Sequence, residues 1–294
     1  MYDTTKPYSE RIQEIVKRTQ IGKDFPPSST DGIGEKGRYH WQQRTFREVA
    51  LDALFQNLND AGVMRFKVKY LQNHIMIPRD DEGAITEIVE TLAEQCIKRN
   101  IVITSGETAI HESYPGVEIS VNVQGEYIER RPNVFQQNEV LLGAGSNGFT
   151  KIGEIFGSEF NPEFVRPTPS YYDALLDLLK QRFQISGMIH VTGGAFTRLK
   201  SPLGKGLDAI VDGTSLIPQS IFYEISSKEV PDEEMYRTFN CGVGLILAAP
   251  EKDLEDIIHA FSFHGFNPRP IGKVVSGTGK VKIKSAFSDK QIIY

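Results

Sequence analysis

The chain has 294 residues, a formal net charge of -5, a pI near 5.8, 39% hydrophobic residues and 24% charged residues. This composition predicts one large or two ordinary packed domains, and it argues against disorder and against nucleic acid or an anionic membrane as the main partner. No apolar run reaches the length of a membrane span, the first residues lack a signal-peptide core, and Cys96 and Cys241 have no metal-type spacing. We therefore expect a soluble, cytoplasmic protein with reduced thiols.

The first part of the chain alternates helix and strand patterns. Apolar residues at helical spacing predict helices, whereas alternating or continuous apolar runs predict strands. In chain order we expect a helix over 9–19, a helix over 46–62 with Gly62 as its C-cap, a strand over 63–72, a helix over 82–100, and strands over 101–106 and 116–128. The polar, proline-containing stretch 129–139 is then typical of a linker.

The second part mixes strands and helices without a strict parallel rhythm. We expect, in order, a strand, turn and helix over 140–157, a helix over 170–183, a strand, turn and helix over 188–199, strands over 206–214 and 235–250, a helix over 251–265, and a strand hairpin over 270–283. This order favours an α+β protein of two domains, over residues 1–132 and 133–294, rather than one doubly wound sheet.

Glycine-containing turns recur beside the predicted strands, over 29–36, 104–111, 143–149, 190–196 and 236–244. Glycine lets a ligand approach the peptide N–H groups, and such groups can hold phosphate. Neither a Walker A loop nor a dinucleotide-binding fingerprint is present. The turns carry polar side chains, which together predict a polyphosphate site assembled from both halves of the chain: Asp31, Lys36, Glu107, Thr108, Asn147, Thr192, Arg237 and Asn240.

The residue types in these turns suit phosphoryl transfer. Carboxylates such as Asp31 and Glu107 would hold Mg²⁺, which prefers oxygen ligands and bridges to phosphates. Lys36 would balance phosphate charge. These residue types suffice in kind, because catalysis of phosphoryl transfer depends mainly on positioning and charge compensation. The structural alternatives are a turn-stabilising role for Asp31 and a solvated Lys36. His190 lies in an apolar strand and is expected to be a core or edge histidine.

At this point the chain resembles a known family, the AIR synthetases, or phosphoribosylformylglycinamidine cyclo-ligases. The motifs that carry the resemblance occur in family order across nearly the whole chain, and "MYRTFNCGVG" is the most specific of them. The others are "STDGIGEK", "SGETAI", "SNGF", "HVTGG" and "RPTPSYYDALLDLL".

The resemblance implies a fold and a reaction. The fold has an N-terminal α+β domain whose strands form a barrel across a homodimer, and a C-terminal α/β sandwich. The reaction uses ATP and Mg²⁺ to phosphorylate the amide oxygen of formylglycinamidine ribonucleotide, after which a substrate nitrogen closes the imidazole ring. The implied catalytic residues are Asp31, Lys36 and Asn147. The implied nucleotide contacts are Gly32, Gly34, Glu107, Thr108, Thr192, Gly193, Gly194, Arg237 and Asn240.

Several positions depart from the family pattern. "QIGKDFPP" replaces a glycine-rich segment, Ile110 replaces a carboxylate and Gly145 a histidine. A gapless match through Gly62 puts Asn57 where the family has a metal-binding Asp, so Asn57 joins Asp31 and Glu107 as a candidate metal ligand. Asp60, about one helical turn further on, would substitute only if the helix shifted.

These departures leave two alternatives to an active cyclo-ligase. One is another ATP-dependent enzyme of the superfamily, such as a thiamine-phosphate kinase; a selenophosphate synthetase is disfavoured because residues 1–30 contain no cysteine. The other is a non-catalytic dimeric partner protein.

Overall fold

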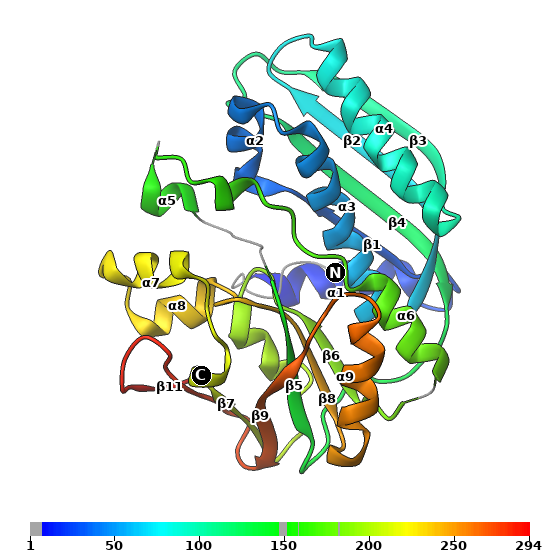
Figure 1. The fold of residues 1–294 in the computed structure, drawn as a ribbon. Helices are drawn as coiled ribbons and strands as arrows, with labels where there is room; N and C mark the ends of the chain where they lie inside the picture. Colours follow the sequence, from blue (N-terminus) through cyan, green and yellow to red (C-terminus); the bar gives the residue numbers. More distant parts are fainter. Residues whose placement is uncertain (1–7, 147–151, 158, 182) are drawn as a thin grey trace.

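The computed structural model describes residues 8–146, 152–157, 159–181 and 183–294, and every structural statement below concerns these residues. They form two β-sheets, which we call the small sheet and the large sheet (Figure 1). None of the helices in these ranges combines the length and apolar composition that crossing a bilayer requires.

The small sheet comes from the first part of the chain. Its strand order is β1 (Ser28–Gly32), β4 (Glu118–Tyr127), β2 (Phe66–Ile77) and β3 (Val102–Ile110). Strands β2 and β3 are parallel and the other pairs antiparallel. Helices α3 (Phe46–Val63) and α4 (Glu82–Arg99) cover one face (Figure 1). Helix α1 (Ser9–Gln20) precedes β1, and η1 (Gly34–Lys36) and α2 (Gly37–Gln43) lie between β1 and α3.

Local sequence explains where the two covering helices begin and end. The side chain of Asp81 accepts a hydrogen bond from Ala84 N at the start of α4, and Asn100 adopts the left-handed conformation that ends it. The expected C-cap at Gly62 is wrong, because α3 continues to Val63. A side chain at Gly62 would come within 2.7 Å of Leu175, so this glycine permits close packing instead.

Alternation along the small sheet buries one face and leaves the other uncovered. Val68, Leu71 and Ile75 of β2 point into the core beneath the helices, while Tyr70 is half exposed. Strand β3 runs through Gly106 to Ile110, so the glycine turn expected at 104–111 is instead the interior of a strand.

The large sheet follows the order β11, β10, β7, β9, β5, β8, β6. All neighbours are antiparallel except β7 and β10. The strands are β5 (Val140–Gly145), β6 (Gly187–His190), β7 (Leu207–Asp212), β8 (Val243–Ala249), β9 (Arg269–Ser276), β10 (Val281–Lys284) and β11 (Gln291–Ile293).

Helices cover both faces of the large sheet, which explains why β8 is buried along its whole length. One face packs on α6 (Tyr172–Gln181) and α9 (Leu254–Ser262). The other packs on η3 (Ala195–Lys200), α7 (Ser220–Ser227) and α8 (Asp232–Thr238) (Figure 1). The short elements α5 (Ile152–Phe156), η2 (Pro162–Val165), η4 (Gly213–Ser215) and η5 (Glu251–Asp253) complete this part.

Two expectations for this region are wrong. The expected hairpin over 270–283 does not form, because β7 lies between β9 and β10 in the sheet. The expected strand over 235–250 is helical at its start, since α8 reaches Thr238 and β8 begins only at Val243.

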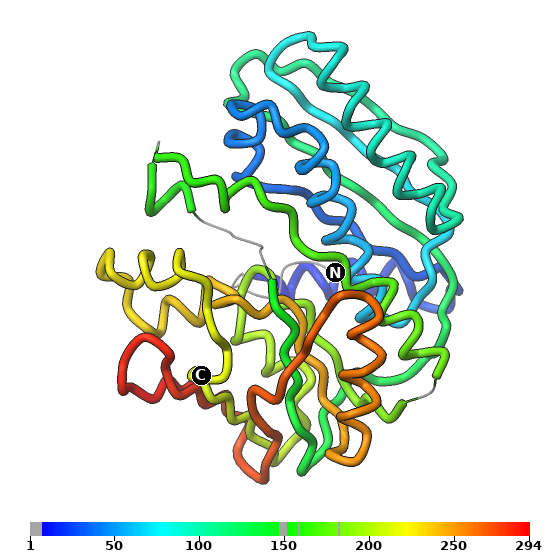
Figure 2. Tube along the Cα trace, viewed as in Figure 1, coloured from blue at the N-terminus to red at the C-terminus, as the bar shows by residue number. Residues whose placement is uncertain are grey.

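The two parts of the molecule share their cores. Tyr39 of α2 packs with Phe164 in the core of the large sheet, and Tyr172 and Leu176 of α6 join the core of the small sheet. The green trace in Figure 2 shows the connection: the chain leaves α5, passes beside the first part of the molecule, and returns to the large sheet through α6.

Candidate functional site

Two carboxylates and a histidine meet where the small and large sheets approach one another. Asp31 lies near the end of β1, and its Oδ1 accepts a hydrogen bond from Gly32 N at 2.8 Å. Asp60 of α3 interacts electrostatically with Asp31. His190, the last residue of β6, places Nδ1 at 2.9 Å from Asp60 Oδ1. The site therefore draws on both sheets, as the glycine turns predict.

The hydrogen bonds of His190 determine which ring nitrogen carries the proton toward Asp60. Nε2 lies 3.4 Å from Asn59 Nδ2, which is a donor, because the Asn59 Oδ1 accepts from Tyr171 N at 2.7 Å. Nε2 is thus the acceptor, and Nδ1 donates to Asp60. His190 is buried and partnered as expected for a core histidine, but its partner is a carboxylate of the site.

The two carboxylates have opposite pKa shifts. Burial raises the pKa of Asp31, and the neighbouring Asp60 charge raises it further. Burial alone would raise the pKa of Asp60 as well, but the hydrogen bond that His190 donates and the charge of Arg198 hold this pKa below its ordinary value. A bound cation would relieve the repulsion between the two carboxylates.

The donor set suits a metal that keeps waters and phosphate oxygens as ligands. Within the described ranges, no cluster of three or more histidine, cysteine or acidic residues is arranged to hold a metal ion. Mg²⁺ needs only one or two carboxylates when phosphate supplies the other oxygens. Asp31 and Asp60 fit that requirement.

Asn57 does not present its side chain toward an open site. It is fully buried, and its Nδ2 donates to Ala53 O at 3.0 Å and to Asp31 O at 3.2 Å. Its buried Oδ1 has no hydrogen-bond partner in the described part of the chain. Asn57 therefore supports the backbone at Asp31. Asn59 and Asp60 of the same helix reach the site directly, through their contacts with His190.

Lys36 lies in a buried ion pair. Its Nζ is 2.5 Å from Asp52 Oδ2 and 2.9 Å from Arg166 O, and the residue is 3% exposed. The structure thus directs Lys36 toward α3 and the segment before α6, and not toward the carboxylates. The solvated alternative is therefore wrong for Lys36, while its phosphate role stays a prediction.

The structure does not bring Glu107 to Asp31 within one chain. The register aligns Asp31 with Gly106, across β4 and β2, and Glu107 with Gly32. Three strand spacings separate the two acidic residues, about 14 Å. One residue of offset also turns their side chains to opposite faces of the sheet. Glu107 and its neighbour Thr108 are exposed on the edge strand.

The turn after β6 lies beside the site. Gly194 adopts φ +82°, which favours glycine, and Gly193 has open space where a side chain would stand. The Thr192 hydroxyl accepts a hydrogen bond from Arg198 Nη1, and Arg198 also approaches His190 O at 3.4 Å. In the turn after β1, Gly34, with φ +62°, also has open space where a side chain would stand.

The "MYRTFNCGVG" residues have other surroundings. Arg237 is exposed on α8, 3.7 Å from Glu234 and over the ring of Tyr294. Asn240 is buried, accepts from Gly242 N at 2.9 Å and donates to Ser146 Oγ at 3.3 Å. Asn240 therefore holds the end of β5. Asn147, the next residue predicted to act, lies outside the described residues.

Asp60 was expected at the site only if its helix shifted, and Asn59 and Arg198 were missed there. A signal for the first two was present in the sequence. The helix over 46–62 is apolar on several sides, yet it carries Asp52, Asn59 and Asp60 at spacings that share one face. Buried polar side chains are costly unless partnered, so polar residues on such a face indicate a specific contact.

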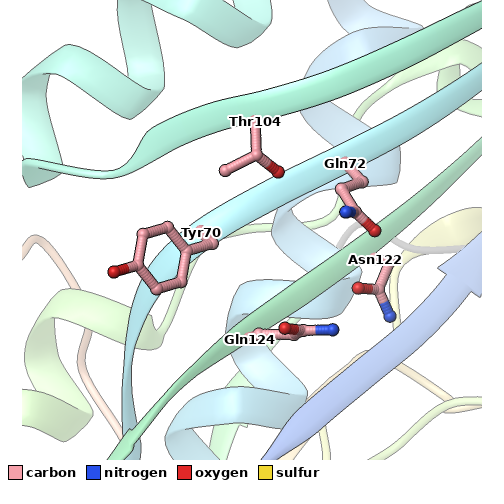
Figure 3. Close-up of a pocket in the computed structure, with 5 residues that line it drawn as sticks. All are labelled: Tyr70, Gln72, Thr104, Asn122 and Gln124. Carbon is pink, nitrogen blue, oxygen red and sulfur yellow. The ribbon is translucent and has the colours of Figure 1, made fainter.

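A shallow pocket lies on the uncovered face of the small sheet, away from the carboxylates. The side chains that line it are polar and uncharged and come from three neighbouring strands, as Figure 3 shows: Tyr70, Gln72, Thr104, Asn122 and Gln124. Asn122 Nδ2 donates to Thr30 Oγ1 at 2.6 Å, which extends this polar surface to β1.

Comparison with known proteins agrees with this arrangement. Residues 27–126 match the family model for the N-terminal domain of AIR synthase related protein, and residues 136–284 match the model for its C-terminal domain.

Two curated relatives are named phosphoribosylformylglycinamidine cyclo-ligase. The one from Clostridium perfringens (strain 13) is 30% identical over 281 residues, covering 87% of this chain and 83% of the relative. The one from Saccharolobus solfataricus is 27% identical over 263 residues, covering 85% and 79%. Among solved structures, the hydrogenase maturation protein HypE in complex with ATP has a TM-score of 0.70 at 16% identity, covering 99% and 95%. The chain belongs to the AIR synthase related protein family.

Proposed function

We propose that the chain catalyses the ATP-dependent ring closure of formylglycinamidine ribonucleotide to aminoimidazole ribonucleotide, with release of ADP and phosphate. The observation that carries this proposal is the Asp31–Asp60 carboxylate pair held between the two sheets by His190. Relatives that align over most of the chain carry the name of this activity. A structural neighbour with the same fold is described in complex with ATP.

The roles follow from the chemistry of the step. The substrate amide oxygen attacks the γ-phosphorus and ADP leaves; a substrate nitrogen then attacks the activated carbon and phosphate leaves. Phosphoryl transfer depends on positioning and charge compensation. Asp31 and Asp60 would hold Mg²⁺, which supplies charge compensation to the phosphates when bound. The peptide groups of Thr192, Gly193 and Gly194 would line the phosphate side, since Gly193 leaves room for close approach.

We also propose a homodimer formed through the uncovered face of the small sheet. That face carries half-exposed Tyr70, and the edge strand β3 carries exposed Val102 and Ile110, which a second copy would cover. Glu107 and Thr108, remote from Asp31 in one chain, would then serve the site across the interface. The domain boundary is proposed at 132/133, within the connector from β4 to β5. Sedimentation velocity tests the dimer: Thr104→Arg, in the pocket on this face, should give monomers.

A coupled ADP-release assay with formylglycinamidine ribonucleotide tests the activity. The chain should turn over, and Asp31→Ala should abolish turnover while Asp177→Asn, at an exposed ion pair on α6, should leave it unchanged. Absence of turnover at high enzyme concentration, together with no Mg-ATP binding in calorimetry, would show that the function is different. ADP release that needs another phosphate acceptor would identify a different kinase or synthetase of the family.

A further inference from the structure

Helix α3 is joined to the segment before α6 by a row of buried polar contacts. We call residues 166–171 the strap; Figure 2 shows it as part of the green trace between α5 and α6. Asp52 Oδ1 accepts from Thr168 N at 2.8 Å. About two helical turns along, Asn59 donates to Pro169 O at 2.9 Å and accepts from Tyr171 N at 2.7 Å.

Lys36 completes this row from the other side. Its Nζ bonds both Asp52 Oδ2 and Arg166 O, so one ammonium group connects the turn after β1, helix α3 and the strap. Lys36, Asp52 and Asn59 are each at most 3% exposed. A buried ion pair is costly to desolvate, and it persists where further hydrogen bonds satisfy both charges, as they do here.

The row ends at the candidate site. Asn59, which holds the strap at two points, also approaches His190 Nε2, and the next residue, Asp60, accepts from His190 Nδ1. Displacement of the strap would therefore disturb Asn59 and, with it, the contact between α3 and β6. The turn that carries Lys36 also follows Asp31 in the chain.

We infer that Lys36 is a positioning residue, which locks the strap on α3 and so sets the placement of Asp60 against His190 without touching the nucleotide. This inference rests on the proposed function only for the identity of the ligand. The competing role is the one expected from the residue type, in which Lys36 contacts phosphate directly.

Hydrogen–deuterium exchange tests the lock without any ligand. Because residues 167 and 169 are prolines, the strap has few backbone N–H groups that can exchange. Those of Thr168 and Tyr171 donate hydrogen bonds to side chains of α3. Peptides covering 166–172 should exchange slowly in the wild type and at least ~10-fold faster in Lys36→Met, with β8 peptides unchanged. Lys180→Met, which breaks an exposed lysine–aspartate pair, is the matched control and should exchange like the wild type.

Nucleotide affinity then separates positioning from direct contact. Calorimetry with Mg²⁺ and AMP, ADP or ATP should show that Lys36→Met weakens all three by a similar factor, roughly 10-fold to 100-fold, because misplacement affects the whole site. Asp52→Asn keeps an acceptor for Thr168 N and should also weaken the binding of all three nucleotides. This variant replaces Lys36→Met in the test if Lys36→Met does not fold.

Direct contact predicts different results. A loss in Lys36→Met that grows from AMP to ATP, with strap exchange unchanged and Asp52→Asn binding like the wild type, would overturn the inference. Faster strap exchange in Lys36→Met, in a protein whose wild type binds none of these nucleotides, would support the lock and reject the proposed function. Unchanged strap exchange in both variants would reject the lock whatever binds.

Discussion

Two aspartates on helix α3 have opposite surroundings. Asp52 is 1% exposed, paired with Lys36, and accepts a backbone N–H, so both of its oxygens are satisfied within the protein. Asp60 has a partly exposed side chain and lies beside Asp31, another carboxylate. The difference shows that charge alone does not mark a site on this helix. A carboxylate matched by a buried cation contributes to the fold, whereas repulsion between two neighbouring carboxylates favours binding of a cation from outside the chain.

The largest expected effect is on activity, at the two neighbouring carboxylates Asp31 and Asp60, which we call the unmatched pair. Asp60→Asn keeps the shape of the side chain but removes its charge, so turnover should fall by about 10²–10³-fold. The free energy of unfolding should change by only about 1 kcal/mol, the typical net value of one hydrogen bond. The ADP-release assay and urea unfolding measure the two quantities. Full activity in this variant would remove Asp60 from the site.

At the buried ion pair of Lys36 and Asp52, which we call the matched pair, the expected loss is one of stability. Asp52→Ala leaves a buried ammonium without its partner and should lower the free energy of unfolding by about 3–5 kcal/mol. Replacing both residues, as Lys36→Met with Asp52→Leu, should recover much of that loss, because the desolvation cost also disappears. Urea unfolding of the wild type, Asp52→Ala and the double variant measures this. Equal stability in Asp52→Ala and the wild type would contradict the comparison.

The matched pair also affects the acid sensitivity of the fold through His40 of α2. His40 is fully buried, with Nδ1 2.9 Å from Thr45 Oγ1 and an unpartnered buried Nε2. Burial, and then the Lys36 charge, lower the pKa of His40 from 6.5 to about 4. Between pH 4 and pH 6.5, His40 is therefore protonated in the unfolded chain but neutral in the folded protein. Stability should fall by up to about 3 kcal/mol from pH 6.5 to pH 4 for this reason.

His40→Gln isolates that contribution. Its free energy of unfolding should decline less steeply over the same pH interval, whereas exposed His111→Gln should follow the wild type. Parallel curves for His40→Gln and the wild type would assign the acid loss to other groups.

The smallest effect is expected at Arg237, which belongs to neither pair. Because its side chain is exposed and contacts Glu234 and Tyr294, Arg237→Ala should change the free energy of unfolding by less than about 0.5 kcal/mol. Nucleotide affinity should change less than about twofold, since the residue lies on α8 and not beside the carboxylates. A loss above tenfold would show that Arg237 reaches the ligand in the bound state.

Local patterns predicted the elements that pack through local periodicity. Helices α3 and α4 and strand β4 lie close to their expected ranges because regularly spaced apolar residues of each are buried. The hairpin over 270–283 failed because β10 pairs with β7, a partner distant in sequence. The start of α8 was missed, although Pro231 precedes the helix and its first turn is acidic, which is a common pattern at the beginning of a helix.

The site was predictable only in part for a similar reason. Asp31 was proposed from its turn, and a site drawn from both halves of the chain was expected. The contacts of Lys36 with Asp52 and Arg166 arise from tertiary packing, which a local sequence pattern does not show. Asp60 was expected at the site only if its helix shifted, yet α3 runs to Val63 and Asp60 contacts His190.

The position of β10 affects the order in which the chain can fold. Val281 pairs with Ala209, so one side of β7 stays without its neighbour until the residues of β10 have left the ribosome. Strands joined over such long separations form slowly, and an unpaired strand edge promotes aggregation. A nascent chain that stops at Gly279 should therefore aggregate, as light scattering would show. The last strands of the large sheet would then protect the newly made protein as well as complete its core.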